Sequence, residues 1–78
     1  MGKRLSDLRQ LEFARIRAVH GETHTVARIF SLGFLPGRQV RHSHTALLGD
    51  PRAYLVDGQI IAMRRADASC VEIEEVHP

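Results

Sequence analysis

Four of the five histidines in this 78-residue chain form two pairs whose spacing could hold a metal ion. His42 and His44 are two residues apart and would share one face of a strand, while His20 and His24 flank the expected start of a helix. Imidazole nitrogen binds iron, zinc and nickel. Soluble iron sites normally add carboxylates or thiolates at compatible positions, which these pairs lack. We therefore expect no metal site, with His42 on the core side of its strand and the other four histidines in solvent.

The residue types that carry catalysis are not arranged for it in the sequence. A nucleophile beside a base, or an acid and base pair of carboxylates, would be needed, and no motif of either kind is present. A glycine-rich phosphate-binding loop is also missing. The one cysteine, Cys70, precedes Val71 in an expected strand, where a buried and inert thiol is typical. We predict a protein that is not an enzyme, with no catalytic residues and no cofactor.

The elements that would position these side chains are organised around the stretch from Leu32 to Val40. Gly33 can adopt the left-handed conformation that ends a helix, and Pro36-Gly37 fits a type II turn. Between them, Phe34-Leu35 could hold the helix against a sheet. The apolar spacing is helical before this stretch and alternating after it, so a helix must end here and a strand must begin.

The period of the apolar residues divides the rest of the chain into short elements. Alternation predicts strands, spacings of three and four predict helix, and Asp57-Gly58 is a strong signal for a tight hairpin. The expected elements are a helical turn after Ser6, strands over 13–19, 38–45, 53–56, 60–63 and 70–74, a helix over 23–32, and a turn at Leu48-Gly49-Asp50-Pro51. Five short strands in so small a chain favour a partly open barrel, because rolling up the sheet removes most exposed edges.

Length and composition indicate one small domain covering residues 1–78. The chain is 44% hydrophobic and 26% charged, which is typical of a globular protein. No apolar run approaches the length of a membrane span, and the basic start does not lead into an apolar signal segment. A single cysteine cannot form an internal disulfide, which agrees with a reducing compartment. We expect a cytoplasmic protein that is not embedded in a membrane.

The charges are distributed unevenly along the chain. Residues 1–41 contain eight Lys and Arg against three acids, whereas residues 42–78 contain three Arg against six acids. A basic half could suit an acidic partner, but a small barrel can fold both halves onto one surface. Nucleic-acid binding would also use aromatic stacking, and the single Tyr and three Phe are not interleaved with the arginines. No nucleic-acid partner is expected.

Several short motifs along the chain are recognisable by their order and spacing. They are Arg28-Ile29, Leu32-Gly33-Phe34-Leu35-Pro36-Gly37, Val40, Leu48-Gly49-Asp50-Pro51, Met63-Arg64-Arg65, Val71 and Ile73. From about Leu5 to Val76 the chain thereby resembles the FeoA family, small cytoplasmic proteins that accompany the bacterial ferrous-iron transporter FeoB. Two positions depart from the family pattern, since His42 replaces a core-side aliphatic residue and Leu47 replaces a proline.

The resemblance implies a fold and a function. The fold is a mainly β, small SH3-like five-stranded barrel with an inserted α-helix and a short N-terminal helical turn, which agrees with the order of elements above. The function is that of a non-enzymatic accessory or regulatory protein of ferrous iron uptake, which binds the cytoplasmic side of FeoB. Two alternatives remain open: an iron-sensing SH3-like domain as in iron-dependent repressors, and a small basic nucleic-acid-binding barrel.

The expected partner surface is the outer face of the inserted helix and the turn after it. This helix is the one element added to the barrel, so its outer face is not needed for closing the fold. The apolar spacing places Val26, Ile29 and Leu32 inward and leaves Phe30 on the flank. The predicted partner-binding residues are Arg28, Ile29, Phe30 and Leu35, and the predicted structural turn residues are Gly33, Pro36, Gly37, Gly49, Asp50 and Pro51.

Overall fold

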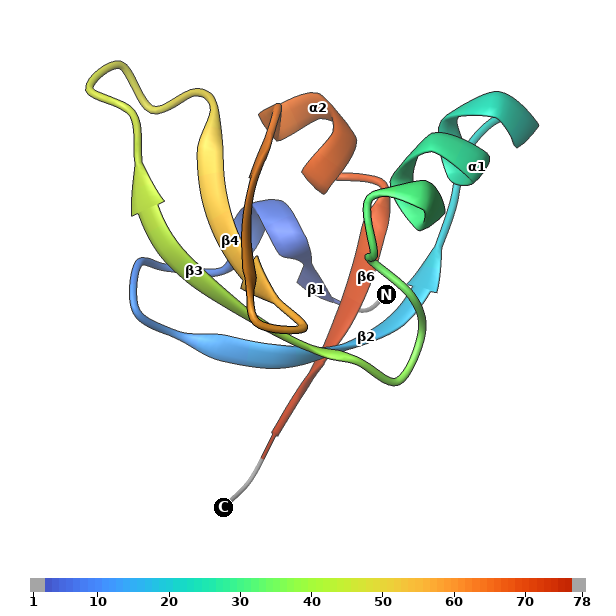
Figure 1. Ribbon diagram of the computed structural model, residues 1–78, viewed down its shortest axis with the longest axis horizontal. Coiled ribbons are helices and arrows are strands. Elements are labelled where there is room, and N and C mark those ends of the chain that lie inside the picture. The colour runs from blue at the N-terminus through green and yellow to red at the C-terminus, as the bar shows by residue number, and fades with distance from the viewer. Residues whose placement is uncertain (1–2, 77–78) are drawn as a thin grey trace.

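The alternating segments form six antiparallel strands in one sheet, in the order β1-β6-β2-β3-β4-β5 (Figure 1). The computed structural model describes residues 3–76. The strands are β1 (Lys3–Arg4), β2 (Phe13–Val19), β3 (Gln39–Thr45), β4 (Arg52–Val56), β5 (Gln59–Met63) and β6 (Val71–Glu75), and the helical elements are the 3-10 turn η1 (Leu5–Asp7), α1 (Thr23–Ser31) and α2 (Arg65–Ala68).

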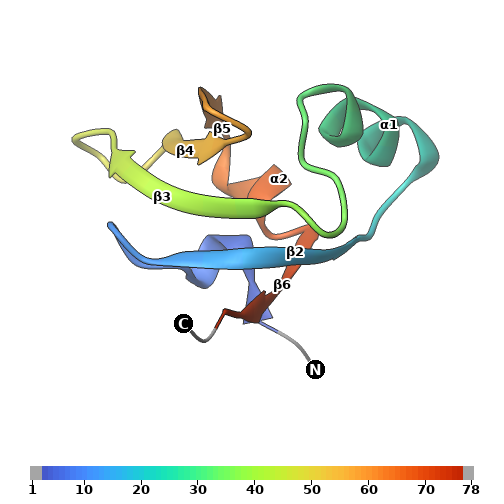
Figure 2. The same ribbon diagram turned by 60° about the horizontal axis from the view of Figure 1, so that its bottom comes forward.

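The sheet contains one strand more than the sequence predicted. The additional strand, β1, pairs with β6 through Lys3 and Arg4, and two residues are too few to show alternation. A second short helix, α2, occupies the segment between the strands predicted over 60–63 and 70–74, where the sequence predicted no helix or strand. Within residues 3–76 β1 and β5 form the two edges of the sheet, which is therefore curved but not closed. Figure 2 shows β2 and β3 side by side, with β6 on one side of this pair and β4 and β5 on the other.

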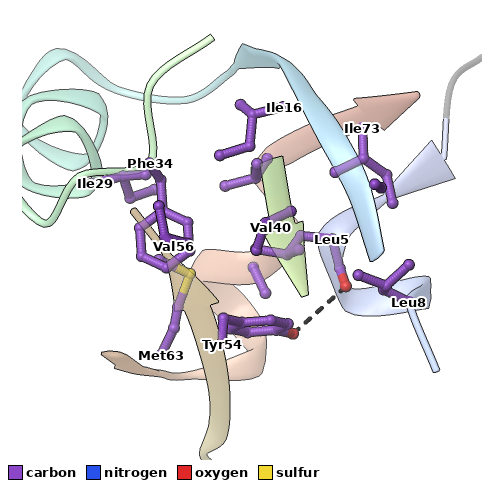
Figure 3. Packing of buried hydrophobic residues seen from close by; sticks show 13 residues of the cluster. Leu5, Leu8, Ile16, Ile29, Phe34, Val40, Tyr54, Val56, Met63 and Ile73 are labelled. Carbon is purple, nitrogen blue, oxygen red and sulfur yellow. Dashed lines mark hydrogen bonds between the residues drawn. The ribbon is translucent and has the colours of Figure 1, made fainter. Parts of the chain in front are cut away.

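One apolar core fills the concave side of the sheet (Figure 3). Tyr54 and Phe34 have no exposed surface, and their rings meet edge to face with centroids 6.2 Å apart. Burial raises the pKa of the Tyr54 hydroxyl, which donates a hydrogen bond to the carbonyl oxygen of Leu5 at 3.4 Å. Leu5 and Leu8 are both buried, so the predicted helical turn does cover one end of the core. Leu11 does not join them, because a positive φ of 73° turns it into solvent.

The junction after α1 is built as the sequence predicts. Gly33, with φ of 105°, donates to the carbonyl oxygen of Phe30 at 2.9 Å, and Phe34 donates to that of Ile29 at 3.4 Å. These two bonds form a Schellman motif, which satisfies the last carbonyl groups of the helix. Gly37, with φ of 92°, then occupies the third position of a turn closed by a bond from Arg38 to Leu35. The chain reverses within five residues and enters β3.

A β-bulge in β3 separates the two histidines that the sequence placed together. His42 pairs with Tyr54 and His44 pairs with Ala53, so Ser43 has no opposite residue on β4. Tyr54 and Ala53 are adjacent on β4 and face opposite sides of the sheet. His42 is therefore buried, while His44 is exposed on the other side. The prediction of a core-side His42 is confirmed, but the prediction of a shared face is wrong.

The other predicted turns are also present. Gly49, with φ of 90°, donates to the carbonyl oxygen of Ala46 and turns the chain between β3 and β4. Asp57 and Gly58 have φ of 51° and 78°, which is the pattern of a type I′ hairpin between β4 and β5. Local backbone chemistry thus determines both connections.

Candidate functional site

The helix α1 is attached to the sheet by few side chains. Among its residues only Ile29 is fully buried, while Val26 and Phe30 are half-buried. Phe34 follows the Schellman motif and lies beside Ile29 beneath the helix (Figure 3). A contact between these two positions commonly accompanies that motif. In Figure 2 α1 lies beside the sheet at the far end of β2, and five of its nine residues are exposed.

An ion pair joins α1 to α2. Arg28 donates from Nη2 to Oδ1 of Asp67 at 2.7 Å, across 39 residues of sequence. The carboxylate is the more enclosed partner, with a side chain 26% exposed against 52% for the arginine. The sequence pointed to Arg28 but not to its partner, since no helix was predicted between the strands over 60–63 and 70–74. The guanidinium group of Arg28 is therefore exposed at the surface and is held in place by Asp67.

The structure separates the predicted partner-binding residues into two groups. Arg28 is exposed, and Phe30 and Leu35 are half-buried, so all three present some surface. Ile29 does not: its side chain has no exposed area, because it is the one residue that holds α1 on the core. We therefore expect Ile29 to support the residues that can contact a partner.

Leu32 is the residue that the sequence misplaced. It was expected to complete the inward stripe of the helix, yet the residue is 39% exposed. The helix ends at Ser31, and the turn at Gly33 brings Phe34 into the space where Leu32 was expected. We define the α1 surface as Arg28, Phe30, Leu32 and Leu35.

A charged group anchors the chain where it enters α1. Glu72 on β6 accepts from His20 at 2.8 Å and lies 3.3 Å from the guanidinium of Arg17. The hydrogen bond from His20, followed by the attraction of Arg17, holds the pKa of the Glu72 carboxyl below its usual value. The backbone N–H of His20 also donates to the carbonyl oxygen of Cys70. These contacts position the segment that leads from β2 to α1.

The histidines do not assemble a metal site within residues 3–76. Nδ1 of His42 donates to the carbonyl oxygen of Leu8 at 2.8 Å, and its Nε2 lies 2.7 Å from the hydroxyl of Thr45. Both ring nitrogens are thus engaged in the fold. No group of three or more His, Cys, Asp or Glu side chains in the described chain could hold a metal ion. The fifth histidine, His77, lies outside the described residues.

Further apolar surface lies away from α1. Leu47 and Leu48, at the tip of the loop between β3 and β4, are 100% and 93% exposed. On the outer side of the sheet an open groove of about 490 Å³ is lined by apolar and charged side chains, among them Phe13, Arg41 and Leu55. In the described chain no helix is long and apolar enough to cross a membrane.

Comparison with protein families and solved structures agrees with this architecture. A family model described as the FeoA domain matches residues 3–75. The chain is similar to the FeoA protein of Chlorobium tepidum, with 27% identity and a TM-score of 0.87, over 96% of this chain and 71% of that one. No curated protein sequence matches.

Two further structures help to define the fold. The Stenotrophomonas maltophilia FeoA, solved in complex with zinc and described as a prokaryotic SH3 domain protein, is 26% identical with a TM-score of 0.81, over 92% of this chain and 89% of that one. The predicted SH3-like fold is confirmed. The T. acidophilum IdeR is 20% identical with a TM-score of 0.82, over 95% of this chain and 34% of that one, which shows a shared fold alone.

Proposed function

Because the chain belongs to the FeoA family, we propose that it is a cytoplasmic accessory protein that binds the cytoplasmic part of the FeoB transporter. The family associates it with ferrous iron uptake, and FeoA proteins are small accessory domains and not a known enzyme family. The S. maltophilia relative is described as a candidate ferrous iron transport activating factor. We extend that role to this chain, with binding and not catalysis as its means of action.

We place the docking site on the α1 surface. The observation that carries this placement is the light attachment of α1, whose one fully buried side chain is Ile29. Phe30, Leu32 and Leu35 offer apolar area that the core does not enclose. Apolar side chains beside an arginine are the usual composition of an interface centre, where truncating one well-packed residue typically costs about 2 kcal/mol or more.

The role of Arg28 follows from its ion pair. Asp67 already holds the guanidinium, so the arginine loses little side-chain freedom when a partner binds. Arginine can engage a second carboxylate because its planar group carries five donors. We therefore expect an acidic group on the transporter opposite Arg28, with the apolar contacts beside it.

Co-purification of folded variants with FeoB tests this docking site. Phe30→Ala and Leu35→Asp should each weaken association about tenfold or more. Leu47→Asp is the matched control, because Leu47 is exposed, apolar and located on a loop far from α1 in both ribbon views (Figures 1 and 2). Leu35→Ala accompanies Leu35→Asp, so that loss of binding can be separated from loss of folding by thermal melting.

The results of this experiment distinguish the α1 surface from other docking sites and from a different partner. Wild-type retention of both Phe30→Ala and Leu35→Asp would exclude the α1 surface. Loss of binding with Leu47→Asp alone would move the interface to the β3–β4 loop. No retention of the wild-type protein itself would contradict the proposed partner.

A further inference from the structure

We propose that two copies of this chain pair through β5, in antiparallel orientation, to continue the sheet across a two-fold axis at Ile61. The strand β5 is an edge of the sheet and is hydrogen-bonded to β4 alone. Its residues, from Gln59 to Met63, contain no charge and no proline. Edge strands are usually protected by charges or prolines, and an uncharged apolar edge is a template for another strand. The opposite edge, β1, consists of Lys3 and Arg4 and has that protection.

The backbone of β5 determines which groups are free. The two-residue turn at Asp57-Gly58 makes Val56 and Gln59 a hydrogen-bonded pair, so the N–H and C=O groups of Gln59, Ile61 and Met63 point toward β4. The corresponding groups of Ile60 and Ala62 point away from the sheet. Within residues 3–76 the structure contains no hydrogen bond to these outward groups. They are two donors and two acceptors in the spacing of an antiparallel ladder.

The geometry of that ladder restricts the register. The free N–H and C=O groups of one β5 strand can bond only to the free groups of the other copy. The two-fold axis that relates the copies can therefore pass through Ile60, Ile61 or Ala62. With the axis at Ile61, each Ile60 lies opposite Ala62 of the other copy, and all four outward groups of each strand are satisfied. The half-buried Ile61 side chains then meet on one face, while Ile60, which is 56% exposed, covers Ala62 on the other.

Charge complementarity favours the same antiparallel orientation. In this arrangement the hairpin end of β5 in each copy, which carries Asp57, lies beside the α2 end of the other copy, which carries Arg64 and Arg65. Arg65 forms no ion pair within the described chain. The side chain of Asp57 is 72% exposed, with Arg38 3.6 Å away as its one cationic partner.

Because the β5 edge is complementary to itself, its partner is a second copy of this chain. An antiparallel pair about a two-fold axis brings the same patch of both subunits together, so every favourable contact occurs twice. The paired edges are short, and small interfaces of this kind give transient complexes. We expect a monomer-dimer equilibrium with a dissociation constant on the order of 100 μM.

Sedimentation of the whole protein between about 10 μM and 1 mM tests the pairing. The wild type should show a concentration-dependent shift from monomer to dimer. Ala62→Pro should abolish that shift, because it removes an outward N–H group and leaves the bonds to β4 intact. Ala62→Ser keeps the N–H group and is the matched control, which should dimerise as the wild type does. Thermal melting confirms that each variant is folded.

A charge-reversal pair tests the antiparallel orientation. Arg65→Glu brings a glutamate near Asp57 of the other copy, and Asp57→Lys brings a lysine near Arg64 and Arg65 of the other copy, so each variant alone should remain monomeric. Mixed together, they should form heterodimers, because both ionic contacts then have opposite charges. A merely structural effect of either substitution would not produce this rescue.

Three results would overturn the proposal. The wild type could remain monomeric at about 1 mM, Ala62→Pro could dimerise as well as the wild type, or the mixture could associate no more than its components. If the wild type is monomeric and Ala62→Pro instead reduces co-purification with FeoB, the edge receives a strand of the transporter and not a second copy.

Discussion

The two ends of this small sheet are secured in very different ways. At the η1 end, the carbonyl oxygen of Leu8 accepts from His42 at 2.8 Å and from Arg52 at 3.3 Å, while Leu5 accepts from Tyr54. At the α1 end, one buried side chain, Ile29, and the ion pair of Arg28 hold a nine-residue helix. The chain thus places stability at one end and leaves surface available for a partner at the other.

The largest losses of stability are expected when isoleucine is replaced by alanine, once in the sheet and once in α1. Ile16 in β2 and Ile29 in α1 are 1% and 0% exposed, so Ile→Ala removes the same buried atoms from both. Ile16→Ala should lower the free energy of unfolding by about 2–5 kcal/mol. Ile29→Ala should fall at the low end of that range, because a lightly attached helix can shift to fill the cavity. Urea denaturation measures both, and a cost for Ile29→Ala equal to or above that of Ile16→Ala would make α1 an integral part of the core.

The two histidines of β3 test how strongly the η1 end is held. His42→Ala should cost about 2–4 kcal/mol, because it leaves a cavity and removes a donor from the carbonyl oxygen of Leu8. His44→Ala, at an exposed position, should change stability by less than about 0.5 kcal/mol. Thermal melting of the two single variants is the measurement. If folded His44→Ala protein loses iron-uptake activity, the structural role assigned to these histidines is incomplete.

Gly33→Val tests the helix end. A φ of 105° strains any residue with a Cβ, and the expected cost is about 1–3 kcal/mol. The expected loss of stability does not come from a steric clash, since an added Cβ would meet only Nη1 of Arg38, at 3.5 Å. Gly33→Ala, the control, should therefore cost nearly as much as Gly33→Val in a denaturation experiment. An unchanged melting temperature would mean that the junction accommodates another backbone conformation.

Acidification should weaken the entrance to α1 by a small amount. The pKa of Glu72 is lowered in the folded state, so its contribution to stability is present above the ordinary glutamate value of about 4.3 and is lost as the pH falls through the folded pKa. Glu72→Gln should be less stable than the wild type at neutral pH, with the difference disappearing in acid. Melting curves across this range, with Glu74→Gln as an exposed control, measure the effect. A pH-independent difference would assign the contribution to packing.

The sequence determined the features that depend on local backbone chemistry. The helix end at Gly33 and the hairpin at Asp57-Gly58 were predicted because few residues adopt a positive φ without strain. The alternation over 13–19 likewise predicted the strand β2, in which Ala14 and Ile16 are buried. The short strand β1 was missed, since two residues form a strand only because β6 lies beside them.

The tertiary structure decided which residues share a face and which partners they meet. The bulge at Ser43 depends on how β3 pairs with β4, so no pattern within β3 alone could show that His42 and His44 diverge. Arg28 meets Asp67 because the fold brings α2, 39 residues later in the chain, within reach of α1. Side-chain spacing defines a face only while the backbone remains regular, and strand pairing and helix packing determine where that regularity ends.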